Sequence, residues 1–415
     1  MALHGENNMR KKHVLFIVEN NPVPYDARVW AEARAVKELG HDVSVICPRS
    51  PKSPKALEEL EGISIHRHYA PLEAGRKSGF IFEYLNALFW EFVLSIRIFK
   101  RDRFHVIHSA NPPDHVFIIA AFFKLLGVKF IFDHHDICPE NYLAKFGRRD
   151  LFYRSLLIAE RLTFETADIV ISTNESYKSI AIDRGRKCAD EVFVVRNGPD
   201  LSRVTFPEPN KKLREGFEYL VAYLGEIGNQ EGIDILLRSI RHIVTNLGIA
   251  NIKFILIGTG PHWKQMVALS KQMGLERFVE FTGFIPFKDL YEILSTADLC
   301  VNPEFKNDFT DRSTMLKIMD YMTFGKPILQ FHTREGEVTA GMAAIYITEN
   351  DEVKFAEALL YLLHDPDKRK KMGEAGSRRI REELCWDKQK INLKNAYLHL
   401  LNGKGIQSVP EETCN

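Results

Sequence analysis

The chain has 415 residues, of which 45% are hydrophobic and 27% are charged, and its formal net charge is +1. This length exceeds one ordinary hydrophobic core, so we expect two domains. The composition is globular rather than disordered or membrane-spanning, and the charge balance provides no basic field for nucleic acid. The six cysteines stand singly, without a CxxC pair or metal-ligand spacing. We therefore expect free cysteines, near the core at Cys47, Cys138 and Cys300, and a reducing cytoplasmic setting.

In the first half of the chain, short apolar runs rich in β-branched residues alternate with helical patterns. This alternation predicts repeated βαβ units, which form a parallel sheet covered by helices on both faces. The predicted strands are residues 13–19, 42–47, 63–68, 105–109, 129–133, 169–172 and 192–195. The predicted helices are residues 28–39, 80–99, 116–126 and 151–166.

The most hydrophobic stretch, residues 80–99, carries three charges and is followed by the basic residues Lys100, Arg101 and Arg103. These charges argue against a membrane span. Two interpretations remain open. The stretch is either a core-packed helix with a solvated end, or a peripheral contact of residues 80–103 with an anionic membrane surface.

The alternation restarts in the second half, after a linker at residues 197–216 that contains an Asn-Gly-Pro-Asp turn. We expect an N-terminal domain over residues 1–200, a second domain over 201–385, and a final helix and polar tail over 386–415. Ligands of doubly wound sheets bind beyond the carboxyl ends of the strands, so the expected site lies in a cleft between the domains. The second set of strands is predicted at residues 219–224, 253–257, 279–281, 299–302, 327–330 and 345–348, with helices at 233–247, 262–273, 287–295, 313–323 and 354–363.

The densest chemical signal is residues 311–325, DRSTMLKIMDYMTFG. Ser313 and Thr314 are good N-cap residues and predict a helix start directly after a strand. The free amides and the positive dipole of such a start can bind a phosphate, and Lys317 lies one turn further on. Asp320, about one turn beyond Lys317, is placed to bind a ribose diol. The alternative is an ordinary capped helix packed on a sheet.

This segment resembles the donor-binding motif of family 4 retaining glycosyltransferases, which have the GT-B fold of two Rossmann-like domains facing across a cleft. Asp320 matches the glutamate that binds the ribose of the nucleotide in that family. The family's other glutamate, eight residues earlier, falls on Arg312, so this chain is similar to a variant subgroup. The resemblance implies that Asp311 or Arg312 faces the donor sugar. It also implies that four consecutive residues supply amides to the diphosphate: Ser313, Thr314, Met315 and Leu316.

Two N-terminal segments extend the resemblance, which covers about 390 residues in order. Residues 20–48 are similar to the family's opening loop, helix and second strand. Arg28 in this segment either neutralises a phosphate or holds an acceptor, or it is a surface residue at a helix start. The run FDHHDICPE resembles the family's His-Asp loop, in which His135 matches the residue that contacts the donor sugar, with Asp136 beside it. A His-His-Asp cluster also suggests a metal ion, but the resemblance implies no metal.

Residues 223–232 resemble the family's first C-terminal strand and loop, with Gly225 at its glycine. The family's arginine and lysine are replaced by Glu226 and Glu231, and two acids there would repel a diphosphate at close range. Either the loop points these acids elsewhere, or the phosphate charge is carried by Lys317, Arg312 and Arg28.

Two further segments match in the second domain. Gly258 belongs to a GTGP turn into a helix, as in the family. Phe284 and Ile285 match the positions that hold the nucleotide base, although a buried core aromatic is the alternative for Phe284.

The resemblance implies a metal-independent glycosyltransferase that uses a nucleotide sugar, most commonly UDP-linked. The implied acceptor is a glycan or lipid-linked glycan in cell-surface polysaccharide assembly, at the cytoplasmic side of the membrane. We predict retention without a covalent intermediate, although Glu231, Asp136 or Asp311 are candidate nucleophiles. Two alternatives are an epimerase on the same fold and a non-catalytic, glycosyltransferase-like binding protein. A Rossmann dehydrogenase is disfavoured because no G-x-G-x-x-G follows the first strand.

Overall fold

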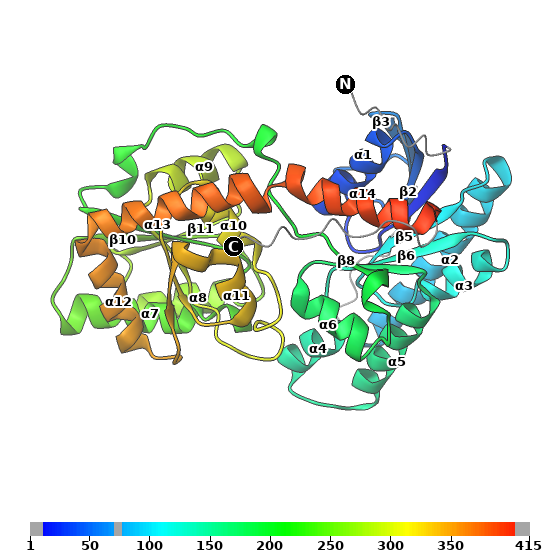
Figure 1. Ribbon diagram of the computed structural model, residues 1–415. Coiled ribbons are helices and arrows are strands. Elements are labelled where there is room, and N and C mark those ends of the chain that lie inside the picture. The colour runs from blue at the N-terminus through cyan, green and yellow to red at the C-terminus, as the bar shows by residue number, and fades with distance from the viewer. Residues whose placement is uncertain (1–10, 70–76, 403–415) are drawn as a thin grey trace, which may run out of the picture. The chain divides into compact units, whose positions relative to one another are not determined.

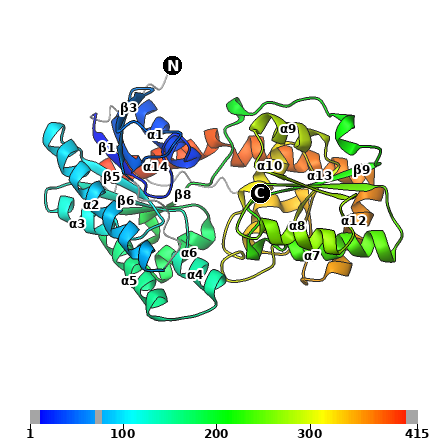
Figure 2. The ribbon, with the colours of Figure 1, turned by 180° about the vertical axis from the view of Figure 1, so that it is seen from behind.

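The computed structural model describes residues 11–69 and 77–402, except the side chains of residues 77–83 (Figures 1 and 2). The chain forms two compact units. Within the described residues, the first unit contains 11–139, 148–195 and 390–402, and the second contains 140–147 and 196–389. The predicted polar tail after residue 402 lies outside the described residues.

The first unit contains an eight-stranded sheet in the order β3-β4-β2-β1-β5-β6-β7-β8. All neighbours pair in parallel except β3, which forms an antiparallel hairpin with β4. The strands are β1 His13–Ile17, β2 Asp42–Pro48, β3 Leu57–Leu60, β4 Ile63–His68, β5 Val106–Ala110, β6 Lys129–His134, β7 Ile169–Ser172 and β8 Val192–Val194. The helices of this unit are α1 Ala27–Glu38, α2 Lys77–Arg101, α3 Phe117–Lys124, α5 Leu151–Thr166 and α6 Glu175–Asp183.

The second unit contains a six-stranded, fully parallel sheet in the order β11-β10-β9-β12-β13-β14. Its strands are β9 Tyr219–Leu224, β10 Ile252–Ile257, β11 Val279–Gly283, β12 Leu299–Asn302, β13 Ile328–Phe331 and β14 Ala344–Ile347. Its helices are α7 Ile233–Arg241, α8 Trp263–Gln272, α9 Phe287–Thr296, α10 Leu316–Thr323, α11 Arg334–Ala340, α12 Glu352–His364 and α13 Pro366–Arg379. Two helices have residues in both units, α4 Cys138–Phe146 and α14 Trp386–Asn402.

Alternation along each central strand divides the second unit's core into two layers. Val221 and Tyr223 of β9 pack with residues of α7, α8 and α12, whereas Leu220 and Ala222 pack with residues of α9 and α10. Figures 1 and 2 show these two groups of helices on opposite faces of the sheet. Because both faces are covered, the strands read as continuous apolar runs rather than as alternating ones.

The predicted pair of doubly wound domains is therefore confirmed. Four helices and one strand were not predicted, namely α4, α6, α11, α13 and β3. The helix α13 is too polar to show an apolar stripe, and the short acidic strand β3 lies at the sheet edge, where its exposed side chains carry little patterning. The expectation of free cysteines agrees with the structure, since Cys47 and Cys300 are buried thiols and Cys138 is partly buried.

Candidate active site

In each sheet, the strand order reverses between two neighbouring parallel strands, β1 and β5 in the first unit and β9 and β12 in the second. In doubly wound sheets the loops that leave two such strands at their carboxyl ends diverge, and ligands bind between them. In the second unit, Gly225 follows β9 and Glu304 follows β12 by two residues. Helix α10 begins nearby, and Lys317 in its first turn faces both strand ends.

The ammonium of Lys317 is buried between two carboxylates. Its Nζ donates to Glu304 Oε1 at 2.9 Å and also to Glu231 Oε2, and Glu231 accepts a second hydrogen bond from Tyr223 Oη at 2.6 Å. The ammonium also lies 5.1 Å from the centre of the Tyr223 ring. Glu231, Glu304, Lys317 and Tyr223 together form what we call the lysine cluster.

Burial and mutual contact set the protonation of this cluster. Burial raises the pKa of Glu304 to about 7, because desolvation outweighs the attraction of Lys317. The two carboxylates hold the pKa of Lys317 above its ordinary value although burial acts to lower it. Lys317 therefore stays charged, and its ammonium pairs with both Glu231 and Glu304.

This arrangement shows how the two unusual acids of the 223–232 loop, Glu226 and Glu231, are accommodated. Glu231 is buried and paired, so its charge does not face a ligand as a free carboxylate. Glu226 is exposed. Lys317, which we expected to reach a phosphate, is engaged by Glu231 and Glu304 in this structure. The space beside it is tight, because a Cβ added to Gly225 would lie 3.0 Å from its Nζ.

The helix start differs from the prediction. Helix α10 begins at Leu316, and the N-cap residue is Met315, whose side chain makes no capping hydrogen bond. The predicted cap at Ser313 and Thr314 is therefore wrong. The backbone from residue 313 to 315 precedes the helix, with the Ser313 amide donating to Phe309 O at 3.1 Å. Consequently, the amides with no intrahelical partner begin at Leu316 rather than at Ser313.

Asp320 lies one turn further along α10 and is half-buried. Burial alone raises its pKa to about 7. Among the described residues, no cation and no hydrogen-bond donor is paired with this carboxylate. A half-buried acceptor without a protein partner is what a site for hydroxyl donors requires.

Asp311 and Arg312 have protein partners. Burial acts to raise the pKa of Asp311, but the hydrogen bond from the Arg334 amide, at 2.8 Å, and the Lys306 ammonium, at 3.2 Å, hold it below its ordinary value. The Arg312 guanidinium lies 3.6 Å from Glu140. Asp311 thus anchors the chain before α11 instead of standing free.

The remaining predicted residues of the second unit lie on its strand ends. Gly258 has a φ of +124° and packs against Gly225, since an added Cβ would lie 1.9 Å from the Gly225 carbonyl oxygen. Phe284 follows β11 and is 80% exposed, so the alternative of a buried core aromatic is wrong. Ile285 beside it is partly buried against the core.

In the first unit, Arg28 is the centre of a buried polar network. Its guanidinium pairs with Glu32 and with Asp133, each at 3.0 Å, and donates to Val195 O at 2.8 Å. Its Nε lies 2.7 Å from His135 Nε2. The interpretation of Arg28 as a surface residue is therefore wrong. Its guanidinium orients His135 and neutralises two acids.

The two histidines of the His-Asp loop have different surroundings. His134 is fully buried between Phe164 and Tyr177, and burial lowers its pKa to about 3. His135 is partly exposed and contacts Asp133. The three residues of the suspected His-His-Asp metal cluster therefore do not share one centre. Glu32, Asp133 and His135 lie close enough to hold a cation, but the Arg28 guanidinium already pairs with both carboxylates.

The loop is fixed by Asn111, which sequence reasoning did not identify. Its Oδ1 accepts from the amides of His135 at 2.6 Å and Asp136 at 3.0 Å, and its Nδ2 donates to the Asp136 carbonyl at 2.7 Å and to Asp114 at 2.8 Å. The signal was available, because Asn111 directly follows β5, which pairs with β6, and the carboxyl ends of neighbouring parallel strands meet at one edge. Glu32, Glu304 and Asp133 were missed because buried acids are indistinguishable from surface acids in a single sequence.

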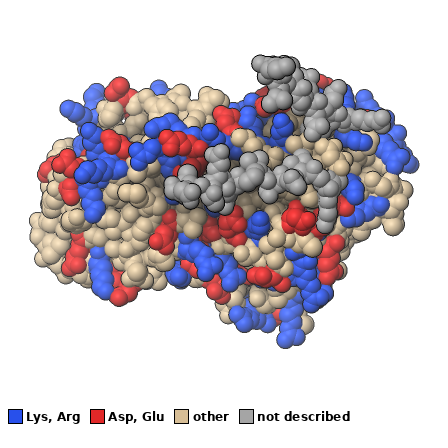
Figure 3. All heavy atoms as spheres, viewed as in Figure 1, with Lys and Arg blue, Asp and Glu red and all other residues tan. Residues whose placement is uncertain are grey.

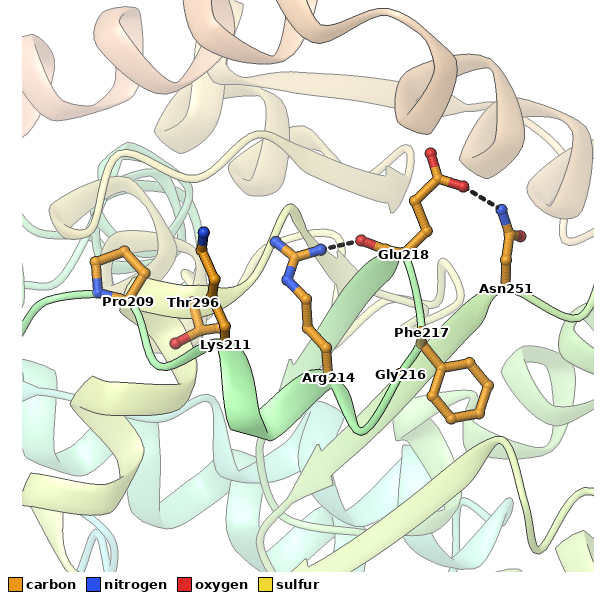
Figure 4. Close-up of a pocket in the computed structure, with 8 residues that line it drawn as sticks. All are labelled: Pro209, Lys211, Arg214, Gly216, Phe217, Glu218, Asn251 and Thr296. Atoms are coloured by element: carbon orange, nitrogen blue, oxygen red, sulfur yellow. Dashed lines mark hydrogen bonds between the residues drawn. The ribbon is translucent and has the colours of Figure 1, made fainter.

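A pocket of about 530 Å³ lies elsewhere in the second unit (Figure 4). It is lined by Arg214, Glu218 and Asn251, which lie before the amino ends of β9 and β10. Arg214 donates to the Glu218 carbonyl, and Asn251 donates to the Glu218 carboxylate at 2.6 Å. Ligands of doubly wound sheets bind at the carboxyl ends of the strands, so this pocket lies at the opposite end of the sheet from the expected site.

Each unit matches a family of known proteins. Residues 27–203 match the family described as Glycosyltransferase Family 4, and residues 218–365 match Glycosyl transferases group 1. D-inositol 3-phosphate glycosyltransferase of Corynebacterium aurimucosum is 22% identical over 254 residues, which are 58% of this chain and 59% of that protein. The chain spans about three fifths of the length of the first curated relatives that it matches.

Solved structures resemble nearly the whole chain. Sucrose-phosphate synthase of Thermosynechococcus elongatus has a TM-score of 0.76 at 18% identity, over 94% of this chain and 100% of that one. HepE of Anabaena in complex with UDP-glucose has a TM-score of 0.72 at 15% identity, with the same coverage. The fold is GT-B. The two family matches, over residues 27–203 and 218–365, support a glycosyltransferase of the family 4 type.

Proposed function

We propose that the protein transfers a sugar from a nucleotide diphosphate sugar, with UDP as the nucleotide, to a glycan or lipid-linked glycan. Asp320 carries the proposal, because its half-buried carboxylate has no protein partner among the described residues. A ribose diol supplies two hydroxyl donors to such a carboxylate. The likeness to HepE, whose structure contains UDP-glucose, supports the choice of UDP.

The departing diphosphate needs positive charge or amide donors as its bond to the sugar breaks. In our proposal the amides at the start of α10, beginning at Leu316, supply them together with the positive end of the helix dipole. Lys317 acts behind them as a positioning residue, since its ammonium ties α10 to Glu231 and Glu304. Exposed Phe284 stacks on the base, with Ile285 beside it.

The contacts also favour retention without a covalent intermediate. A nucleophilic carboxylate must be free to attack the anomeric carbon. Glu231 is paired with Lys317 and Tyr223, and Asp311 accepts from the Arg334 amide and Lys306. Two of the three candidate nucleophiles are thus held by other groups. In this scheme we assign contacts with the donor sugar to His135, which Arg28 orients, to Asp136 and to Arg312.

We further propose that the acceptor is lipid-linked and that the first unit contacts the membrane surface. Helix α2 buries one stripe, which includes Ala87 and Ile98, but leaves Leu85 and Phe89 about 60% exposed. Phe92 packs on Phe122 of α3. More apolar side chains are exposed on α3 and on the two residues after it, namely Ile118, Phe122, Leu125 and Leu126. The basic residues Lys100, Arg101 and Arg103 follow at the end of α2, which suits anionic headgroups.

The described residues contain no helix that is long and apolar enough to cross a membrane. On the face that Figure 3 shows, acidic and basic side chains are interspersed without a continuous field of one sign. Contact would therefore depend on the local apolar and basic residues of α2 and α3. A peripheral position at the inner face of the cytoplasmic membrane is the corresponding proposal for localisation. Sedimentation with anionic vesicles tests it, since Leu85→Ser with Phe89→Ser should reduce the bound fraction.

Nucleotide release from a panel of UDP-, GDP- and ADP-sugars, followed by calorimetry with the nucleotide product, tests the catalytic proposal. Asp320→Asn should weaken nucleotide binding by about 10- to 100-fold, the loss expected when a charged acceptor becomes a neutral amide. It should leave binding of inorganic diphosphate unchanged. Asp351→Asn is a matched control, because Asp351 is a partly buried aspartate that only caps α12.

The nucleotide-release assay and the calorimetry together also separate the alternative functions. Binding of no nucleotide would contradict the proposal and favour a non-catalytic protein with this fold. Turnover of a nucleotide sugar without any acceptor, yielding another nucleotide sugar, would favour an epimerase. Equal loss of affinity for UDP and for inorganic diphosphate in Asp320→Asn would contradict the ribose contact.

A further inference from the structure

A second group of polar side chains lies at the strand reversal of the first unit, outside the residues used above. Glu19 follows β1 by two residues, and His115 lies between β5 and α3. Glu91 reaches the same place from the middle of α2. Because β1 and β5 are neighbouring parallel strands, their carboxyl ends bring Glu19 and His115 together.

Glu91 is the unusual member of this group. It lies on the buried stripe of α2, between Ala87 and Ser95, and its side chain is 0% exposed. Both of its carboxylate oxygens are buried without a hydrogen-bond partner among the described residues. An ionised carboxylate that is buried without compensation costs several kcal/mol, so such a group is normally paired, protonated or bound to a metal.

The three side chains present one ligand atom each to a common point. His115 Nε2 lies 3.0 Å from Glu19 Oε2 and 4.0 Å from Glu91 Oε2, and all three ligand atoms lie within 4.8 Å of one another. Tetrahedral zinc with ligands at about 2.0–2.1 Å requires ligand atoms about 3.3 Å apart. Shifts of about one ångström in the side chains would therefore satisfy this geometry.

We propose that Glu19, Glu91 and His115 bind a divalent zinc ion, with water or another small ligand at the fourth position. The chemistry of the three ligands selects zinc over magnesium, because an imidazole and two carboxylates suit Zn²⁺, whereas Mg²⁺ prefers oxygen ligands and retained waters. The ion ties the middle of α2 to the ends of β1 and β5. Tyr84 of α2, whose ring centre lies 5.9 Å from that of His115, flanks the site.

The comparison with the other three-residue group supports this choice. Glu32, Asp133 and His135 are similarly close, but the Arg28 guanidinium provides their positive charge. No lysine or arginine forms an ion pair with Glu91 or His115 among the described residues. Arg28 thus supplies a cation to the buried acids of that group, whereas the buried Glu91 pairs with no lysine or arginine among the described residues. This inference does not depend on the proposed transferase activity.

Metal analysis of the full chain, purified without a histidine tag and dialysed against zinc-free buffer, tests the proposal. We expect about one zinc per chain in the wild type. Glu91→Gln and His115→Gln should each weaken zinc binding by about 100-fold or more, because each removes a ligand atom. His364→Gln is the matched control, since His364 is exposed and lies in the second unit. It should retain the zinc of the wild type.

Titration of the metal-free wild type with Co²⁺ gives a second measurement that needs no variant. A saturable visible band of four-coordinate Co²⁺, displaced by Zn²⁺, is expected. If Glu91→Gln loses its native circular dichroism, Glu19→Gln replaces it, because Glu19 is less buried. The proposal is overturned if the wild type holds no stoichiometric zinc and shows no saturable Co²⁺ band. It is also overturned if folded Glu91→Gln and His115→Gln both retain their zinc.

Discussion

Replacement of Lys317 by methionine tests the lysine cluster most directly. Methionine preserves much of the apolar stem but removes the ammonium that lies between Glu231 and Glu304. Glu304 is 2% exposed and Glu231 is 7% exposed, so the two carboxylates remain out of water when the cation is lost. The substitution therefore leaves buried negative charge without compensation.

Breaking a buried pair by removing one partner costs about 3–5 kcal/mol of unfolding free energy. For a unit of this size, 1 kcal/mol corresponds to a melting shift of about 2–4 °C. Lys317→Met should therefore lower the melting temperature of the second unit by about 6–20 °C. Adding Glu231→Gln and Glu304→Gln should recover most of this loss, because neutral amides do not repel each other.

Lys253→Met is the matched control. Lys253 is also a buried lysine of the second unit and also pairs with two acids, Glu215 and Glu280. These acids are 67% and 50% exposed, so water can solvate them when the lysine is removed. Ion pairs with exposed partners contribute about 0–1 kcal/mol to the free energy of unfolding. Loss of the two ion pairs in Lys253→Met should therefore lower the melting temperature by only a few degrees. Differential scanning calorimetry of both variants measures the contrast.

The pH dependence gives the same test an independent readout. The pKa of Glu304 is about 7 in the folded protein against an ordinary value of 4.5. The folded state thus binds this proton more tightly than the unfolded state, and the stability that it contributes is complete below pH 4.5 and lost as the pH rises toward 7. Removing the lysine raises the pKa of Glu304 further. Lys317→Met should therefore be closer to wild type at pH 5 than at pH 8.

A Lys317→Met protein that melts within 2 °C of Lys253→Met at pH 8, yet loses nucleotide binding, would refute this reasoning. That result would return Lys317 to the role of a direct phosphate ligand, as the sequence alone suggested. A folded variant with a large melting shift but nearly unchanged affinity for UDP supports its role as a positioning residue.

Three further predictions follow from the same structure. Asp320→Asn should stabilise the ligand-free protein at pH 8 by about 2 kcal/mol, because it removes an unpaired half-buried charge. The gain should vanish near pH 4, where Asp320, with a pKa of about 7, is already protonated in the folded protein. Thermal melts across pH check this, and destabilisation at pH 8 would contradict it. Phe284→Ala should leave the melting temperature nearly unchanged, as expected for an exposed residue, and weaken nucleotide binding by about 10- to 100-fold because stacking is lost. Phe287→Ala, which also changes an exposed residue, should not weaken nucleotide binding. Equal affinities of the two variants by calorimetry would remove Phe284 from the base site. Arg28→Met should destabilise the first unit by about 3–5 kcal/mol, because Glu32 and Asp133 stay buried. Arg34 lies on the same helix and pairs with half-exposed Glu61, so Arg34→Met should cost less than about 1 kcal/mol. Similar denaturant midpoints for the two variants would refute this difference.

Much of the fold could be predicted from the sequence because strands buried on both faces are continuous apolar runs. Residues 219–224 show this directly, since the predicted strand and β9 coincide. Helix boundaries were less accurate. Ser313 and Thr314 have the composition of an N-cap, but the chain before α10 is held by the Ser313 amide bond to Phe309, and the helix begins only at Leu316. At this position tertiary contacts override the local N-cap preference of Ser313 and Thr314.

The sequence by itself determined the class of fold, and it predicted the donor segment and a role for Asp320. These depend on periodicity and on local spacing, which a single chain displays. Only the tertiary structure decided the charge partners. Glu231 and Glu304 are 86 and 13 residues from Lys317, and Arg28 is 105 residues from Asp133. Desolvation and Coulomb interactions depend on distance in space, so a sequence that displays the acids and bases does not display which of them neutralise one another.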